Sequence, residues 1–179
     1  TSRVSGAEHA WKLAVNAGEV GEPAPAALPR GTRVEVRDLF FATPARLKFL
    51  KAERTETSNI TDTVKRLAMA HPQIAFSLTS GGRAVLRYEP ETGNGAALAR
   101  LRAVMGRQFA ENAIAIDAER DGVVLSGYAG LPTLNRGSAQ AQYLFVNGRP
   151  VRDRMLAGAV RGAYQDLLAR HRHPMLALN

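Results

Sequence analysis

Three glycine-containing dipeptides constrain the fold most, because each suits the tight turns that join or end β-strands. They are Gly81-Gly82, Asp121-Gly122 and Asn147-Gly148. Strand-like segments lie on both sides of the first two dipeptides, which predicts β-hairpins over residues 74–88 and 113–128. The third dipeptide follows a predicted strand at 142–146. The chain should therefore contain several short strands.

Helical patterns lie between these strands. Ile60, Val64, Leu67 and Ala68 share one face of a helix predicted at 57–70. A second helix, predicted at 96–105, is closed by a glycine.

Two further helices carry a start signal. Thr43 followed by Pro44 predicts a short helix at 45–51, directly after an alternating segment at 32–37 that predicts a strand. Asp153 is expected to cap a helix at 154–170, which has one broad apolar face.

The order of these elements predicts an α+β fold made of two modules. Residues 90–95 interrupt all periodicity with Pro, Gly, Asn and acidic residues, so we expect a linker there. The predicted domains are residues 1–90 and 94–179.

Composition excludes several classes of function. The chain has no Cys, which removes disulfides, thiolate zinc sites and cysteine nucleophiles, and its four His are scattered, so we expect no metal site. No apolar run approaches the roughly 18 residues that a membrane span requires. These features suit a reducing cytosol, and we expect a cytoplasmic protein.

Charge gives the first indication of a partner. The net charge is +8, and residues 136–173 contain seven Arg against two acidic residues, a local net charge of +5. An uneven basic surface favours a polyanionic partner such as DNA. The high share of Arg alone fits a compositional bias of the genome equally well.

Four arginines are the candidate DNA-binding residues: Arg149, Arg152, Arg154 and Arg161. Arg154 opens the predicted helix and Arg149 lies beside the tight turn, so both can be fixed while exposed. Arginines held in this way bind phosphates with little loss of side-chain entropy, and such contacts carry no sequence information. The alternative interpretation is a solvated polar helix face.

Two blocks of sequence carry a family resemblance. Residues 31–50 read GTRVEVRDLFFATPARLKFL, and residues 142–153 read QYLFVNGRPVRD. The first resembles the fourth ATP-binding motif of the MutL family of DNA mismatch repair proteins, and the second resembles the strand–turn–helix of the domain that follows. The resemblance covers essentially the whole chain, most weakly at 1–29 and 90–140.

This resemblance implies a fold and a set of partners. Residues 1–90 would complete a GHKL (Bergerat) ATPase sandwich. The second module would be a transducer resembling domain two of a ribosomal protein, with a left-handed βαβ crossover. The intact protein would be a homodimer that binds ATP and Mg, binds DNA, and couples mismatch recognition by MutS to strand removal. It would work in the bacterial cytoplasm, associated with the nucleoid.

The resemblance also implies roles for single residues. Thr32, beside Gly31, matches a threonine that hydrogen-bonds near the adenine, and Arg154 matches a position involved in DNA binding. The motifs that supply the catalytic Glu, the Mg-binding Asn and the adenine-binding Asp do not occur. We therefore expect an internal piece of the family's protein, with no catalytic residue and no tight binding of ATP or Mg on its own.

Three alternatives remain open. A type II topoisomerase ATPase subunit belongs to the same class, but its transducer should carry a Gln-x-Lys loop, whereas residues 146–149 favour MutL. A stand-alone nucleic-acid-binding module is a second alternative, and a piece without activity of its own is the third.

Overall fold

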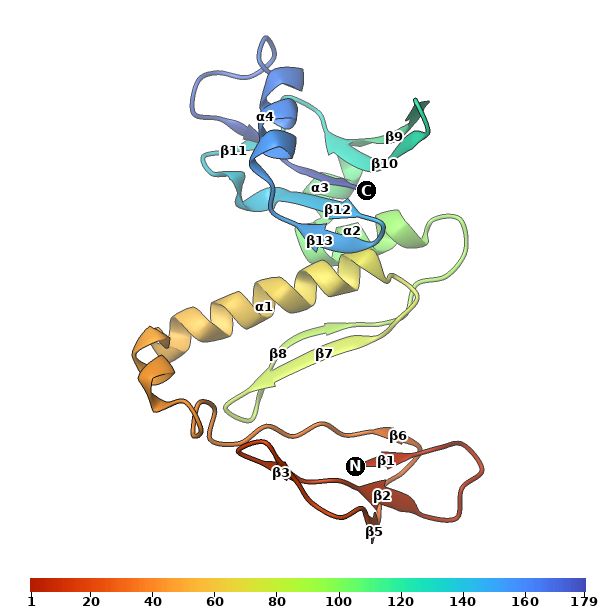
Figure 1. Cartoon of the computed structure of the whole chain (residues 1–179). Helices are drawn as coiled ribbons and strands as arrows, with labels where there is room; N and C mark the ends of the chain where they lie inside the picture. The colour runs from red at the N-terminus through yellow and green to blue at the C-terminus, as the bar shows by residue number, and fades with distance from the viewer. The chain divides into compact units, whose positions relative to one another are not determined.

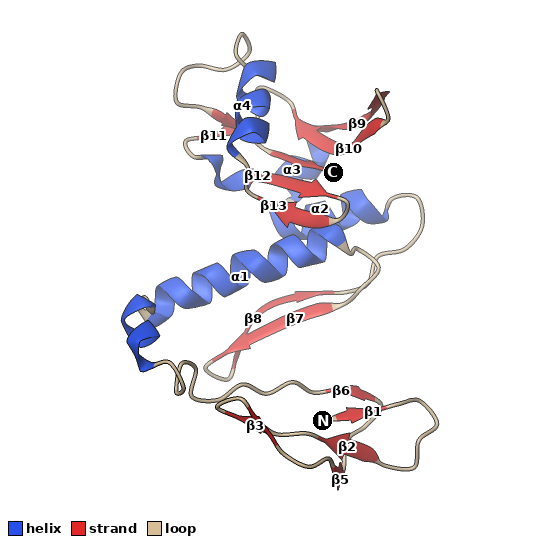
Figure 2. Cartoon of the chain, in the orientation of Figure 1, coloured by secondary structure: helices blue, strands red, loops and turns tan.

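The computed structural model describes every residue from Thr1 to Asn179, and the chain divides into two compact units, Thr1–Glu53 and Arg54–Asn179 (Figure 1). Helices and strands mix along the chain, which confirms the α+β class (Figure 2). The compact units meet at residue 53, whereas the sequence places a domain boundary near residue 92. The domains 1–90 and 94–179 stay a prediction.

The first unit is built from six very short strands. Four of them form an antiparallel sheet in the order β5-β2-β1-β6, and β3 pairs only with β4. The strands are β1 (Ser2–Arg3), β2 (Ala10–Lys12), β3 (Val15–Asn16), β4 (Glu19–Val20), β5 (Ala24–Ala26) and β6 (Gly31–Thr32).

The prediction of a strand at 32–37 is confirmed only for Thr32, the last residue of β6, and is wrong for residues 33–37. Its partner β1 lies at the start of the chain: Ser2 is opposite Thr32, and Thr1 and Arg33 exchange hydrogen bonds of 2.8 and 2.9 Å. Residues 34–37 extend past the end of this partner and gain no ladder hydrogen bonds. An alternating pattern forms a strand only where a neighbouring strand satisfies its backbone groups.

The short helix after this segment has the predicted start but a tighter form. Thr43 is at the N-cap position and Pro44 opens the helix, yet Pro44–Phe49 is a 3-10 helix (η1) and the Thr43 side chain makes no capping hydrogen bond. Leu50 is already extended, so the helix ends before the predicted residue 51.

The second unit contains a five-stranded sheet in the order β13-β12-β15-β10-β9. Both predicted hairpins are confirmed, as is the turn at Asn147-Gly148, which leads into an additional short strand. The strands of this unit are β7 (Phe76–Ser80), β8 (Arg83–Tyr88), β9 (Ala113–Arg120), β10 (Val123–Gly130), β11 (Asn135–Arg136), β12 (Gln142–Val146), β13 (Arg149–Val151), β14 (His173–Pro174) and β15 (Leu176–Leu178).

The pairing of β12 with β15 is parallel, unlike every other pair. The connection between these strands passes through β13 and the helix that follows it, which gives the sheet a βαβ unit. The left-handed sense of this crossover stays a prediction.

A glycine permits the close approach of β15 to β10. Gly127 has a φ of +128°, and a Cβ atom at this position would collide with the carbonyl oxygen of Ala177. Residues with side chains rarely adopt this conformation, so the position requires glycine on two grounds.

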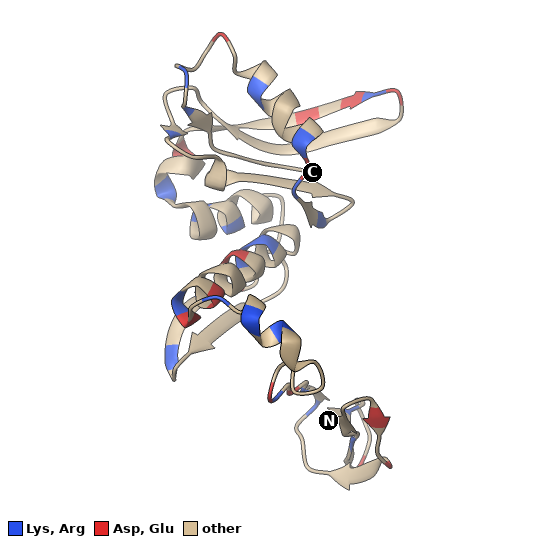
Figure 3. Cartoon of the chain, turned by 60° about the vertical axis from the view of Figure 1, so that its left-hand side comes forward, with Lys and Arg blue, Asp and Glu red and all other residues tan.

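Four α-helices surround the sheet. In the turned view of Figure 3, α2 and α3 lie below the sheet and α4 lies above it. The helices of the unit are α1 (Glu53–Ala70), α2 (Ala96–Met105), α3 (Arg107–Glu111), the short 3-10 helix η2 (Ala139–Ala141) and α4 (Arg154–Ala163).

The hydrophobic core lies between one face of the sheet and the helices α1, α2 and α3. Phe109 on α3 is fully buried and Leu101 on α2 is nearly so, and both pack in one cluster with Tyr143 and Phe145 of β12. Met69 extends the same cluster from the end of α1. This cluster holds the last turns of α1 against the sheet.

A buried arginine joins the first part of this unit to α2. Arg100 is 1% exposed, and its Nη2 donates to the carbonyl oxygens of Pro72, Ile74 and Glu89 at 2.7–2.9 Å. Its Nε and Nη1 are buried without a hydrogen-bond partner. The linker predicted at 90–95 lies between Glu89 and Arg100, which are joined by one of these hydrogen bonds. Both ends of that segment are therefore fixed.

Two predictions about helix faces are confirmed only in part. In the predicted stripe on α1, Ala68 is buried and Val64 is half-buried, but Ile60 and Leu67 stay exposed. The last helix ends at Ala163 rather than near residue 170, and Val160 is its only buried residue. Periodicity defines an apolar face, but the tertiary fold decides whether another element covers it.

Candidate nucleic-acid interface

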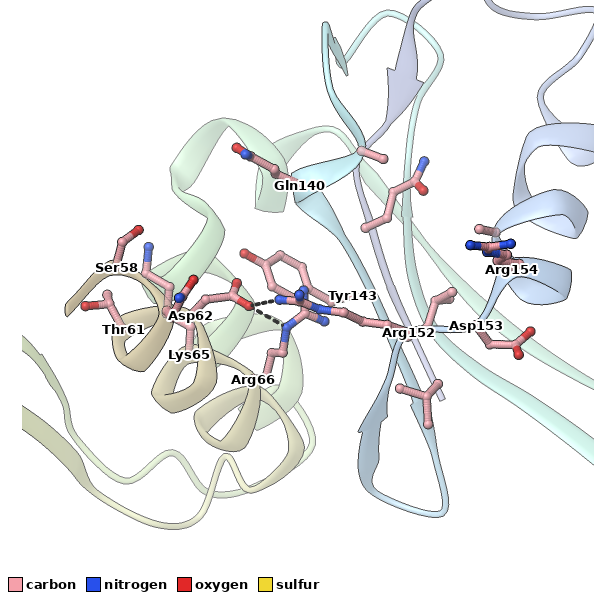
Figure 4. Close-up of a pocket in the computed structure, with 16 residues that line it drawn as sticks. Ser58, Thr61, Asp62, Lys65, Arg66, Gln140, Tyr143, Arg152, Asp153 and Arg154 are labelled. Atoms are coloured by element: carbon pink, nitrogen blue, oxygen red, sulfur yellow. Dashed lines mark hydrogen bonds and ion pairs between the residues drawn. The ribbon is translucent and has the colours of Figure 1, made fainter. Parts of the chain in front are cut away.

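A groove of about 770 Å³ lies between α1 on one side and β12, β13 and the start of α4 on the other (Figure 4). Polar and charged side chains from segments about 90 residues apart in sequence line it. They are Ser58, Asn59, Thr61, Asp62, Lys65, Arg66, Gln140, Gln142, Tyr143, Arg152, Asp153 and Arg154.

The groove carries a positive charge. Four cationic residues and two carboxylates line it, so its net charge is +2. Arg154 is exposed and forms no ion pair, and Lys65 faces the groove from α1. In Figure 3 the ribbon is blue, which marks Lys or Arg, at positions along α4 and just before it.

One carboxylate holds the two sides of the groove together. Asp62 Oδ2 accepts a hydrogen bond from Arg66 Nε at 2.8 Å, four residues further along α1, and another from Arg152 Nη2 at 2.7 Å, which comes from the segment between β13 and α4. Figure 4 shows both guanidinium groups converging on this carboxylate.

The two arginines that share Asp62 differ in exposure. The Arg66 side chain is 11% exposed and its guanidinium carbon lies 4.8 Å from the centre of the Tyr143 ring, whereas the Arg152 side chain is 77% exposed. Arg66 is thus fixed by packing as well as by charge. Arg152 is held by its ion pair alone.

Burial and the two arginines have opposite effects on the pKa of Asp62. Partial burial is the largest single factor and raises the pKa of this carboxyl, but the hydrogen bonds and charges of Arg66 and Arg152 together outweigh it. The pKa of Asp62 therefore lies below its usual value, and the carboxylate is charged at neutral pH.

The helix cap positions Arg154 at the edge of the groove. Asp153 adopts an extended backbone and its side chain accepts a hydrogen bond from the backbone N–H of Leu156 at 3.0 Å, which confirms the predicted cap. Arg154 is consequently the first residue of α4, and the cap fixes where its side chain emerges.

The structure brings together two of the four predicted arginines. Arg152 and Arg154 line the groove. Arg149 lies on β13 and is exposed outside the groove lining, and Arg161 lines a neighbouring groove of about 430 Å³ together with Arg170 and Arg172. Arg152 is paired with the carboxylate of Asp62, whereas Arg154 forms no ion pair.

The residues predicted to contact a nucleotide lie in the first unit. Thr32 is exposed, and its hydroxyl is 2.8 Å from the hydroxyl of Ser2. Gly31 has a φ of +125°, and a Cβ atom built there would meet nothing within 4 Å. The site therefore offers one hydroxyl group and an open backbone.

Sequence reasoning missed the α1 side of the groove. Asp62 and Arg66 have the spacing of a helical ion pair, which the sequence alone could have indicated, but their link to Arg152 depends on tertiary structure. Lys65 and the two glutamines gave no signal. The structure contains no group of three or more His, Asp or Glu side chains placed to hold a metal ion, and no helix long and apolar enough to cross a membrane.

Comparisons with known proteins agree with this architecture. A family model described as "DNA mismatch repair protein, C-terminal domain" matches residues 101–179. The solved structure "Aquifex aeolicus MutL ATPase domain complexed with ADP" is 28% identical, has a TM-score of 0.75, and is matched over 99% of this chain and 63% of that chain. The fold is thus that of part of a GHKL ATPase domain followed by its transducer-like C-terminal part.

Two curated relatives share more sequence identity with this chain than the solved structure does. The chain is 64% identical over 99% of its length to DNA mismatch repair protein MutL of Paramagnetospirillum magneticum, and 59% identical over 99% to that of Rhodospirillum rubrum. It spans 30% and 29% of the lengths of these two relatives. The chain belongs to the MutL family of DNA mismatch repair proteins.

Proposed function

We propose that the groove between α1 and α4 binds the phosphate backbone of DNA in an ATP-dependent mismatch repair protein. The observation that carries this proposal is the placement of Lys65, Arg152 and Arg154 around one groove of net charge +2. A nucleic-acid backbone presents the phosphates that such groups bind. Contacts to phosphates carry no sequence information, so we expect weak sequence preference.

Arg149 and Arg161 extend this surface beyond the groove. Arg149 is exposed at the start of β13, and Arg161 lies in the last turn of α4. A DNA backbone longer than the groove would meet these side chains next. We expect them to raise the affinity for DNA without fixing where the DNA lies. Duplex DNA is the expected partner.

The first unit would supply one part of a nucleotide pocket. ADP is bound in the Aquifex aeolicus MutL ATPase domain named above. In this chain Gly31 leaves room for a ring to approach, and the Thr32 hydroxyl could exchange its bond with Ser2 for one to the ligand. ATP and Mg would then be held mainly by residues of the family that this sequence does not contain.

The whole protein would use these two sites as a matchmaker. ATP binding would close a homodimer and alter the DNA-contacting surface, which would couple mismatch recognition by MutS to strand removal. The family membership supports this role, which suits a cytoplasmic protein that works on chromosomal DNA.

The substitution Arg154→Glu tests the DNA site. Charge reversal should weaken duplex binding by roughly ten-fold, uniformly across sequences. The slope of log K against log salt should fall in magnitude by about one, since one phosphate contact is lost. Fluorescence anisotropy with several duplexes and salt concentrations measures both quantities.

The matched control is Arg102→Glu, which makes the same change of charge at an exposed position on α2. This variant should keep the salt slope of the original chain. Equal losses in the two variants would mean that only net charge matters, and the proposed site would be wrong.

A further inference from the structure

We infer that Asp62 competes with DNA phosphate for Arg152, so that this carboxylate sets the affinity of the groove. The inference rests on the proposed function and deepens it, because it concerns how the same groove is regulated. Its starting point is the shared carboxylate, which holds Arg66 and Arg152 at 2.8 and 2.7 Å.

The two partners of Asp62 are not equivalent. Arg66 is largely buried, packs on the Tyr143 ring, and lies four residues from Asp62 on the same helix. Arg152 is largely exposed and comes from a different segment. When a phosphate approaches, Arg152 is therefore the partner that can leave, because ordering and packing hold Arg66 in place.

The carboxylate remains paired after this exchange. Arg66 Nε continues to donate to Asp62 Oδ2, so the departure of Arg152 leaves no unpaired charge in a partly buried site. Loss of both partners would cost much more, since an unpaired charge in a buried position is strongly unfavourable. The arrangement thus makes release of Arg152 inexpensive.

The direction of release is toward the proposed DNA site. Arg152 and Arg154 flank the Asp153 cap and line the same groove. A backbone that first meets Arg154, which forms no ion pair, would reach Arg152 two residues away. DNA binding would then separate α1 from the β13–α4 junction at the ion pair.

Asp62→Asn tests this inference because it removes the charge and keeps the shape of the side chain. Duplex DNA should bind about two- to five-fold more tightly at about 50 mM salt, which is the range expected when a partly exposed ion pair no longer competes. The gain should shrink as salt rises, because added ions screen the pair in the original chain.

A double substitution separates release of Arg152 from a general change of charge. In an Arg152→Gln background, Asp62→Asn should tighten binding much less than it does with Arg152 present, because only the change in groove charge remains. Glu111→Gln is the matched control: it frees Arg107 from an i,i+4 ion pair of 3.2 Å, where the Arg side chain is 73% exposed, away from the groove lining. This control should bind DNA as the original chain does.

The outcomes distinguish the two proposals. If Arg152→Gln weakens binding but Asp62→Asn does not tighten it, or tightens it equally without Arg152, the competition is wrong and the DNA site stands. If neither Arg152→Gln nor Arg154→Glu affects binding, the proposed function itself fails.

A second measurement does not depend on how the variant folds. In the original chain, NMR of the arginine guanidinium groups during titration with duplex DNA should shift the Arg152 signal and leave that of Arg66 in place. A shift of both signals, or of neither, would contradict the inference.

Discussion

Thr1–Glu53 and Arg54–Asn179 contain similar apolar side chains but bury them to very different degrees. In the first unit only Ala10 is buried, while Val34 and Phe49 are 82% and 75% exposed. The second unit contains every other buried residue, including the cluster around Phe109. Because burial of apolar surface supplies most of the favourable free energy of folding, the second unit should carry the stability of the chain.

The comparison also separates the two proposed sites. The candidate nucleotide residues Gly31 and Thr32 lie in the unit with little core, and the basic groove lies in the unit with a formed core. A site needs supporting residues that fix its geometry. The groove has this support within the chain, because Tyr143 belongs both to its lining and to the core.

Phe109→Ala should produce the largest effect on stability. Removal of a fully buried aromatic ring leaves a cavity, and we expect unfolding to cost about 3–5 kcal/mol less. Phe49→Ala, the matched change in the first unit, should alter the free energy of unfolding by less than about 0.5 kcal/mol. Urea unfolding of both variants measures the difference. Similar losses would contradict the unequal contribution of the two units.

Arg100→Met should have the next largest effect. Three backbone carbonyl oxygens would lose a buried donor, which we expect to cost about 2–4 kcal/mol. The control Arg102→Met is on the same helix at an exposed position and should cost less than about 0.5 kcal/mol. If Arg100→Met were as stable as its control, packing alone would hold α2 to residues 72–89.

Local signals account for the parts of the fold that the sequence predicted well. The hairpins around Gly81-Gly82 and Asp121-Gly122 depend on turns only two residues long, and the Asp153 cap depends on a hydrogen bond to Leu156, three residues away. Such features are decided by neighbouring residues. The strand at 142–146 was also predicted, with the correct ends.

The errors arise where distant residues decide the outcome. Residues 34–37 are not a strand because β1 offers them no partner, and Ile60 stays exposed because the core covers only the last turns of α1. The groove shows the same limit. Arg152 and Arg154 could be chosen from a local excess of basic residues, but the pairing of Arg152 with Asp62, 90 residues earlier, could not.

The smallest predicted difference between the units is the effect of low pH on the free energy of unfolding. Since the folded-state pKa of Asp62 is lowered, its ion pairs stabilise the chain fully above the ordinary Asp pKa of about 3.9 and lose their contribution as pH falls through the lower folded-state value. The stability difference between the original chain and Asp62→Asn should be constant above about pH 5 and should shrink below about pH 3.9.

Glu35 in the first unit provides the comparison for this acid effect. Its hydrogen bond and charge interaction with Arg37 also lower its pKa, but the pair joins residues only two apart and is exposed. Glu35→Gln should therefore leave the unfolding curve unchanged at every pH. Asp62 links α1 to the β13–α4 junction, so Asp62→Asn should lower the free energy of unfolding measurably, by up to about 1 kcal/mol. Urea unfolding at pH 3 to 7 tests both variants. An acid-dependent change in Glu35→Gln, or none in Asp62→Asn, would show that tertiary linkage does not decide which ion pairs stabilise this chain.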